Sequence, residues 1–431
     1  MNYSQTIEYL YTQLPMFTRQ GEQAYKKDLH NTLALCAALG NPHTQFKSVH
    51  IAGTNGKGST SHALAAILQQ AGYKTGLYTS PHIKDFGERI RINGQMIDRQ
   101  FVIDFVQKTK ALASQIQPSF FELTVAMAFD YFAQNKVDIA IIETGLGGLL
   151  DSTNVIKPVL SVITNIGMDH VNILGNSLEE IATQKAGIIK KNTPVVIGEY
   201  LPQTRPVFEA AAKQQHAPIF FATEQYAVTS MIPGPLLHCH VTSLQSGRQS
   251  SYLLDITGSY QSKNLLSILS AKDILQQQGF AITEEQTNAA LKNIKGLTGL
   301  HGRWEIVQHQ PTVILDVAHN ADGISQVMQQ LSTQYAGTPL HFVLGFVKDK
   351  DINHVLSLFP SEASYYFTNA AIPRALPAAE LQQIAAAQGL QGNCFPHINA
   401  AVQAAKAAAS PHDVIMICGS FFIIAELDDV H

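Results

Sequence analysis

Residues 49–82 read VHIAGTNGKGSTSHALAAILQQAGYKTGLYTSPH: a β-branched run, a glycine-rich turn with one lysine, a helical pattern and a second strand-like run. A strand that enters a helix through glycines can bind phosphate, because the helix N-terminus and the accessible amides attract an anion. The turn departs from the usual pattern G-x-x-x-x-G-K-[ST], since only two residues separate Gly53 from Gly56, and Gly58 replaces the magnesium-binding hydroxyl. We predict a nucleotide site in which Lys57 contacts the β- and γ-phosphates; a structural turn with an exposed lysine is the alternative interpretation.

The composition indicates a folded protein with a small-molecule substrate. Of 431 residues, 45% are hydrophobic and 14% are charged, and the net charge of −4 without long Lys/Arg runs argues against a nucleic-acid binder. The start, MNYSQTIEYLYTQLPMF, lacks the pattern of a signal peptide, and the longest apolar run, 414–425, is too short to cross a bilayer. Four scattered cysteines favour reduced thiols. We therefore expect a cytoplasmic protein without membrane or nucleic-acid partners.

Strand and helix patterns alternate in two series. The first series follows a helical region at residues 3–40. Its strand-like and helical runs are, in order, 48–52, 59–71, 74–78, 137–142, 159–165, 178–189 and 194–198. The second series runs from residue 311 to the end of the chain. This alternation predicts an α/β fold with mostly parallel sheets and helices on both faces.

Two segments interrupt the alternation. Residues 218–258 contain short strand-like pieces, which we expect to form an antiparallel appendage. The small-residue stretch KGLTGLHGR, 295–303, separates the two series. We therefore predict an N-terminal domain of residues 1–298 and a C-terminal domain of residues 299–431.

Polar residues stand where several predicted strands end. Ser80, Glu143 and His170 each follow an apolar run, and Lys185 lies on the next helical pattern. Because parallel strands bring their carboxyl ends to one crevice, a hydroxyl, a carboxylate and an imidazole there could hold magnesium. Taken singly, each residue is better explained as a turn, a cap or a helix-dipole partner. The GLGG after Glu143 resembles a dinucleotide turn only weakly, because Leu150 stands at the third glycine position.

A series of motifs in order along the chain resembles one family. GTNGKGST, LYTSPH, ETGLGGLLDSTNV, NIGMDHVNILG, QKAGIIK, GRWE, LDVAHNADG and DKD are similar to motifs of the folylpolyglutamate synthase/dihydrofolate synthase enzymes, which belong to the Mur ligase superfamily of ATP-dependent amide ligases. The resemblance covers essentially the whole chain. It implies a P-loop ATPase domain with a mostly parallel sheet and a smaller, C-terminal Rossmann-like domain that closes over it.

The resemblance also implies an ATP and magnesium site. The residues matched to ATP binding are Thr54, Asn55, Gly56, Lys57, Gly58, Ser59, Asn264, Arg303 and Asp316. Those matched to one or two magnesium ions are Ser80, Glu143, His170 and Lys185. Lys185 matches a lysine that the family carbamylates, which turns a cation into a carboxylate-like ligand. Lys57, His170 and Lys185 are the expected catalytic residues.

The two other substrates are expected at further motif positions. The pterin-bearing acceptor is matched to Phe121, Glu122, Leu150, Asp151 and Ser152, and L-glutamate to His319, Lys348, Lys350 and Ser420, with His319 facing ATP as the alternative. One departure is plain: Leu149 stands where many members have arginine, so a contact to the acidic substrate is expected to be lost.

The implied reaction joins L-glutamate to dihydropteroate or to a reduced folate through an acyl phosphate, in an enzyme expected to be a monomer. Val317, where other members have glycine, resembles bacterial members that use both acceptors. Three alternatives stay open: folylpolyglutamate synthase activity alone, another Mur-type amide ligase, and a nucleotide switch without catalysis. The HCH at 238–240 could pair two histidines on zinc, but surface strand histidines are the better interpretation.

Overall fold

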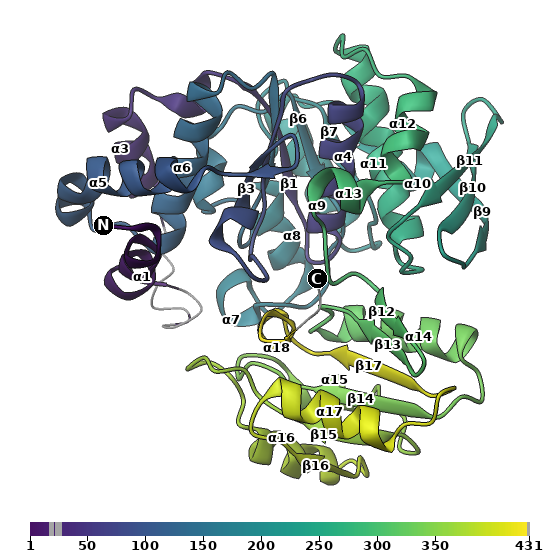
Figure 1. The fold of residues 1–431 in the computed structure, drawn as a ribbon. Helices are drawn as coiled ribbons and strands as arrows, with labels where there is room; N and C mark the ends of the chain where they lie inside the picture. Colours follow the sequence, from purple (N-terminus) through teal and green to yellow (C-terminus); the bar gives the residue numbers. More distant parts are fainter. Residues whose placement is uncertain (17–20, 22–27, 429–431) are drawn as a thin grey trace. The chain divides into compact units, whose positions relative to one another are not determined.

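The computed structural model describes residues 1–16, 21 and 28–428 (Figure 1). The described chain divides into two compact units. The N-terminal unit comprises residues 1–167, 171–255 and 261–300, and the C-terminal unit comprises 168–170, 256–260 and 301–431. The single predicted boundary after residue 298 does not account for the two short segments that join the C-terminal unit.

The N-terminal unit is built on an eight-stranded sheet in the order β4-β3-β2-β5-β1-β6-β7-β8. The strands are β1 (Lys47–Ala52), β2 (Thr75–Tyr78), β3 (Ile90–Ile92), β4 (Gln95–Met96), β5 (Ile139–Glu143), β6 (Leu160–Ile163), β7 (Val195–Ile197) and β8 (Ile219–Phe221). Strands β2, β5, β1, β6, β7 and β8 are parallel, and β3 and β4 form an antiparallel edge. The predicted mostly parallel α/β fold is confirmed.

Helices pack on both faces of this sheet. On one face α4 (Lys57–Gln70) packs against β1, β2 and β5, and α11 (Gln261–Gln277) packs against β6 and β7. Apolar side chains of the other face pack with α5 (Arg99–Ile116), α6 (Phe120–Gln134), α8 (Leu178–Ala186) and α9 (Arg205–Gln215). The remaining helices of eight or more residues are α1 (Tyr3–Gln13), α3 (His30–Ala38) and α12 (Glu284–Leu291). Because α4 is covered by α11 and α12, its residues 59–68 are all buried.

The expected antiparallel appendage forms only in part. Strands β9 (Tyr226–Ile232), β10 (Leu237–Ser243) and β11 (Gln249–Leu254) make a three-stranded antiparallel sheet in the order β11-β10-β9. The beginning of the predicted segment was wrong, because β8 pairs in parallel with β7 at the edge of the large sheet. A three-residue apolar strand has too little pattern to distinguish these two pairings from sequence.

The C-terminal unit holds a six-stranded sheet in the order β12-β13-β17-β14-β15-β16. Its strands are β12 (Glu305–His309), β13 (Thr312–Leu315), β14 (Leu340–Leu344), β15 (Ser364–Phe367), β16 (Gly392–Cys394) and β17 (Val414–Cys418). Its helices are α14 (Ala321–Gln334), α15 (Ile352–Leu356), α16 (Ala378–Ala386), α17 (Ile398–Ala408) and α18 (Phe421–Ala425). Only β12 runs antiparallel to its neighbour, and Trp304, 1% exposed, lies in the apolar core. In the part of the chain that the structure describes, no helix meets the length and apolarity needed to cross a lipid bilayer.

Candidate active site

The glycine-rich turn leaves the centre of the large sheet and opens α4. Gly53 follows β1, and Gly56 precedes α4 with a left-handed backbone (φ 82°). A Cβ at Gly53 would lie 1.8 Å from Thr164 Oγ1, and one at Gly56 would lie 2.2 Å from Asn264 Oδ1. Side chains at either position would therefore clash, which explains the two glycines and places Asn264, matched to ATP binding, against the turn.

The loop after β6 forms one wall of this turn. The amide of Thr54 donates to the Asn165 carbonyl (3.0 Å), and the amide of Asn55 donates to Asn165 Oδ1 (2.8 Å). Thr54 Oγ1 exchanges hydrogen bonds with the backbone of Gly167, and Thr164 Oγ1 donates to the Asn55 carbonyl (2.6 Å). The loop after β6 thus holds the turn in shape.

Two lysines converge on the carbonyl oxygen of Gly53. Lys57 Nζ lies 3.0 Å and Lys185 Nζ 2.9 Å from that oxygen, and Lys57 Nζ also lies 3.2 Å from the Thr54 carbonyl. Lys185 is 3% exposed and comes from the last turn of α8. The sequence separates these lysines by more than a hundred residues, and the fold brings them to one atom. Their catalytic roles stay predictions.

The predicted metal ligands of the N-terminal unit lie at the same edge of the sheet. Glu143 ends β5, is 4% exposed, and pairs in register with Ile51 of β1, just before the glycine-rich turn. Ser80 follows β2, which is the other parallel neighbour of β5. A hydroxyl and a carboxylate beside a phosphate loop fit magnesium, which takes oxygen ligands and few of them from protein.

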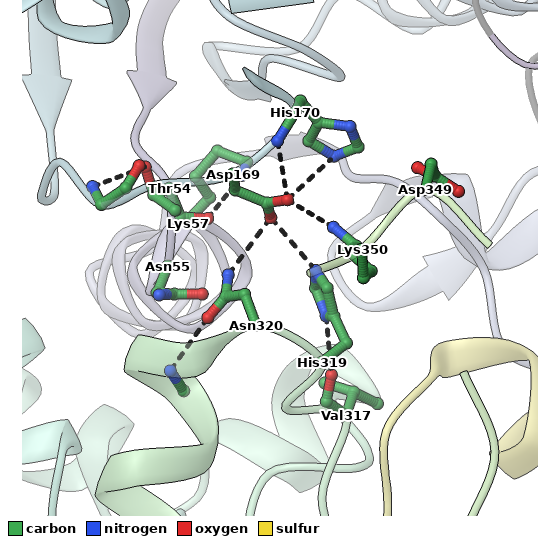
Figure 2. A network of polar contacts seen from close by, with 12 residues as sticks. Thr54, Asn55, Lys57, Asp169, His170, Val317, His319, Asn320, Asp349 and Lys350 are labelled. Atoms are coloured by element: carbon green, nitrogen blue, oxygen red, sulfur yellow. Dashed lines mark hydrogen bonds and ion pairs between the residues drawn. The ribbon is translucent and has the colours of Figure 1, made fainter. Parts of the chain in front are cut away.

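In the C-terminal unit, Asp169 is the centre of a polar cluster (Figure 2). Its carboxylate forms an ion pair with Lys350, lies 3.4 Å from His319 Nε2, and accepts a hydrogen bond from Asn320 Nδ2 (3.2 Å). It also accepts from the backbone amide of His170 (2.8 Å). The carboxylate is 8% exposed. Asp169 therefore orients three predicted site residues, His170, His319 and Lys350. Asp169 itself was not predicted from the sequence, although it directly precedes His170.

Charge and burial oppose one another in this cluster. Burial by itself would raise the pKa of the Asp169 carboxyl, but the hydrogen bond from His319 and the positive charge of Lys350 hold that pKa well below its usual range. Burial lowers the pKa of His170 to about 3, against the opposing effect of Asp169. An anionic carboxylate beside a neutral imidazole results. His170 Nε2, 3.9 Å from Asp169 Oδ1, belongs to a ring that can donate a lone pair to a cation.

A second buried carboxylate, Asp316, organises the start of the C-terminal sheet. It accepts hydrogen bonds from Tyr260 Oη (2.6 Å), the Trp304 amide (2.9 Å) and the Ala318 amide (2.8 Å). Burial raises the pKa of its carboxyl, against the effects of these bonds and of the Arg303 guanidinium. Arg303 itself lies over the Phe421 ring, 5.1 Å from its centroid. Asp316 and Arg303 therefore lie close enough to interact, and their contacts with ATP stay predictions.

Glu122 and Asp151, which are both matched to the acceptor, stabilise the local structure of their own segments. Glu122 is 1% exposed and accepts from the Ser119 amide (2.6 Å), while Ser119 Oγ accepts from the Glu122 amide, completing a capping box at the start of α6. Asp151, 2% exposed, accepts from the amides of Gly145 and Leu146 within its own loop. Direct contacts of these two carboxylates with an acceptor stay predictions that this arrangement does not support.

The remaining predicted residues are partly or fully exposed, except Ser420, which is buried. Phe121 lies against Gly145, where a Cβ would approach its ring to 2.5 Å, and Leu150 and Ser152 are partly exposed on the same loop. Lys348 is exposed, and Ser420 Oγ caps α18 by accepting from the Phe422 amide (3.1 Å). Their contacts with substrates stay predictions.

The zinc interpretation of residues 238–240 gains no support. His238 and His240 share one face of β10 with ring centroids 4.4 Å apart. Across the described residues, His, Cys, Asp and Glu side chains form no group of three arranged to hold a metal. The predicted magnesium ligands are of a different kind, because only Glu143 and His170 among them are acidic residues or histidines, and this finding does not bear on them.

Comparisons with known proteins cover almost the whole chain. The Mur ligase middle domain matches residues 51–271, and the Mur ligase glutamate ligase domain matches residues 302–421. A dihydrofolate synthase/folylpolyglutamate synthase of Bacillus subtilis is 32% identical over 93% of this chain and 94% of its own length. A folylpolyglutamate synthase of Lacticaseibacillus casei is 34% identical over 88% of each chain.

Solved structures agree with these relatives. The structure of E. coli FolC in complex with DHPP and ADP superposes with a TM-score of 0.86 at 26% identity, covering 99% of this chain and 96% of that one. Mycobacterium tuberculosis folylpolyglutamate synthase, solved with ADP and AMPPCP, gives a TM-score of 0.87 at 29% identity over 98% of both chains.

Proposed function

This chain belongs to the folylpolyglutamate synthase/dihydrofolate synthase family of Mur ligases, and we propose that it joins L-glutamate both to 7,8-dihydropteroate and to reduced folates. It is an ATP-dependent ligase. The observation that carries the proposal is the phosphate loop itself. Two lysines contact the Gly53 carbonyl of the glycine-rich turn, and the buried Glu143 is in register with Ile51 of β1 at the carboxyl edge of the parallel strands. A nucleotide switch without catalysis would not require this set.

The reaction follows from what these groups can do. The acceptor carboxylate attacks the γ-phosphorus of ATP in line, the bond to the β,γ-bridging oxygen breaks, and ADP leaves, which gives an acyl phosphate. The neutral amino group of L-glutamate then attacks the acyl carbon; phosphate leaves and the nitrogen loses a proton, giving an amide. Lys57 would stabilise the charge on the transferred phosphoryl group. Magnesium held by Ser80, Glu143 and His170 would neutralise phosphate charge.

Residues of the C-terminal unit are proposed to bind the other substrate groups. Asp316 and Arg303 are the predicted ATP residues, while His319, Lys350 and Lys348 offer donors to the carboxylates of L-glutamate. The resemblance further leads us to propose a monomeric, cytoplasmic enzyme.

We expect ADP release with either acceptor, and only when L-glutamate is present. Both acceptors offer a carboxylate at the far end of their aminobenzoate arm, away from the pterin, so one phosphorylation geometry can serve both. They differ by one glutamyl unit, which requires two binding depths or two pockets. The measurement is a coupled ADP assay with dihydropteroate or tetrahydrofolate, with and without L-glutamate. Turnover with tetrahydrofolate alone would leave a folylpolyglutamate synthase, and turnover with neither would reject the substrate assignment.

We also propose that Lys185 carries a carbamate in the active enzyme. The Lys185 amine lies 2.9 Å and the Lys57 amine 3.0 Å from the Gly53 carbonyl oxygen, so the two amines cannot be farther apart than these two distances together. Two ammonium groups so close repel each other. Addition of CO2 to the neutral Lys185 amine, with loss of one proton, would convert one cation to an anion suited to magnesium. NMR at neutral pH with 13C-bicarbonate should show a carbamate signal in the wild type that is missing in Lys185→Met. Identical spectra would contradict the proposal; acid must be avoided because carbamates are labile.

A further inference from the structure

The loop after β5 is organised by the carboxylate of Asp151, which has no bonding capacity to spare. Oδ2 accepts from the amides of Gly145 (2.9 Å) and Leu146 (2.8 Å). Oδ1 accepts from the Thr153 amide (3.0 Å) and from its hydroxyl. A carboxylate has about four lone-pair sites, and these four donors fill them. Asp151 thus closes residues 145–153 into one defined shape.

Thr153 connects this loop to the strand that carries the phosphate turn. Its hydroxyl has a single proton, which Asp151 accepts, so the His50 Nε2 that lies 2.8 Å from Thr153 Oγ1 must be the donor. His50 and Thr153 are both 0% exposed. His50 lies on β1, three residues before Gly53. A buried chain of three side chains therefore runs from β1 to the loop.

The protonation of His50 is consistent with this direction. Burial, followed in size by the charge of Lys190, lowers the pKa of His50 to about 3, so the ring is neutral and carries one proton. With that proton on Nε2, Nδ1 has none to donate. In keeping with this tautomer, Nδ1 is buried and has no hydrogen-bond partner within the described part of the chain.

The accessible side of the loop is the part suited to contact an acceptor. Leu149 is 42% exposed, Gly145 is exposed, and the Phe121 ring packs against Gly145. We propose that Thr153 and His50 are positioning residues for the folate-type acceptor: they fix Asp151, and Asp151 fixes the loop that presents Gly145 and its neighbours. This inference rests on the proposed function and on the acceptor contacts predicted for Phe121, Leu150 and Ser152, and it assigns a role to two fully buried residues behind them.

The test is Thr153→Val, which removes the hydroxyl and keeps the shape. We expect the KM for the acceptor to rise by about tenfold or more, the effect of losing one buried hydrogen bond, while the KM for ATP stays within about twofold. Thr153→Ser should restore the wild-type value. Thr109→Val is the matched control, because the buried Thr109 hydroxyl also donates one hydrogen bond, to the Phe105 carbonyl on α5. An unchanged acceptor KM, or equal changes for both substrates, would overturn the inference.

A second measurement is independent of activity. Hydrogen exchange of the Gly145 and Leu146 amides should be faster in Thr153→Val than in Thr109→Val, while the amides of Thr54 and Asn55 exchange at the wild-type rate. His50→Phe, which removes the donor from the other end of the chain, should give the same pattern even if Thr153→Val folds poorly. Unchanged exchange would overturn the inference. Failure of the wild type to use any folate acceptor would instead reject the proposed function, since the exchange result stands without it.

Discussion

Replacing Lys57 with alanine is expected to abolish ATP turnover and leave both units folded. Lys57 is the first residue of α4, and its ammonium donates to the Gly53 and Thr54 carbonyls beside the helix N-terminus, where we propose that phosphate binds. Loss of one preorganised donor to a transition-state oxyanion costs about 2.7–4 kcal/mol, or roughly 10²–10³ in kcat, and a full positive charge should lie at the upper end. A coupled ADP assay and a thermal melt measure the two parts of this prediction.

The control for this variant is Lys108→Ala. Lys108, on α5 and 58% exposed, lies 3.8 Å from the 8% exposed carboxylate of Asp130 on α6, which also accepts from Gln134 Nε2 (3.0 Å). Its removal should leave turnover unchanged and lower the melting temperature only slightly. If Lys57→Ala retained wild-type turnover, the phosphate-loop assignment would be wrong. If it failed to fold while the control folded, Lys57 would have a structural role instead.

The second large effect is expected for Asp169→Asn. Lys350 is 7% exposed and paired with Asp169, so removal of the negative charge should leave a buried cation and cost about 3–5 kcal/mol of the free energy of unfolding. The same change releases His319 and Asn320, and misplacement of such groups by about 1 Å can lower kcat by about 100-fold. Chemical denaturation and steady-state kinetics should show both losses.

A double variant separates these two losses. Asp169→Asn combined with Lys350→Met removes both charges, so stability should recover toward the wild type while activity does not. Glu209→Gln, which breaks an exposed ion pair with Arg205 on α9, should cost no more than about 0.5 kcal/mol. Wild-type stability and activity in Asp169→Asn would show that the cluster is dispensable.

The sequence predicted the N-terminal part of the site because its logic is local. Strand, glycine turn and helix are adjacent from residue 49 to residue 82, and parallel strands place their ends together without any knowledge of the tertiary packing. Glu143 and Ser80 were predicted in this way, and they lie at the carboxyl ends of the neighbouring parallel strands β5 and β2; their roles as metal ligands stay predictions. The fold class followed from the alternation of strand and helix patterns along the chain. Strand β8 was assigned to the wrong sheet because three consecutive apolar residues show no periodicity from which its pairing could be inferred.

Asp169 could not be identified by the same means. Its partners Asn320 and Lys350 lie 151 and 181 positions away, His319 directly precedes Asn320, and no spacing rule links them to Asp169. A signal was available, since an acidic residue directly precedes the selected His170. Conversely, the resemblance matches Glu122 to the substrate, whereas its S-x-x-E pattern before an apolar helix predicts the capping box that the structure shows. A motif match indicates that a position is important but does not distinguish a contact with substrate from a structural role.

The short segments 168–170 and 256–260 have a consequence for the modularity of the protein. They are separated in sequence from the rest of the C-terminal unit, yet Asp169 pairs the buried Lys350, and Tyr260 donates to the buried Asp316. A fragment starting at residue 301 would carry the ammonium of Lys350 and the carboxylate of Asp316 without these partners. Recombination between relatives by a single crossover near residue 300 would therefore join a sheet from one parent to supporting side chains from the other. The C-terminal unit therefore consists of a core of about 130 residues and two short segments that lie far from it in the sequence. Substitutions in any one of these three parts must be matched by the other two.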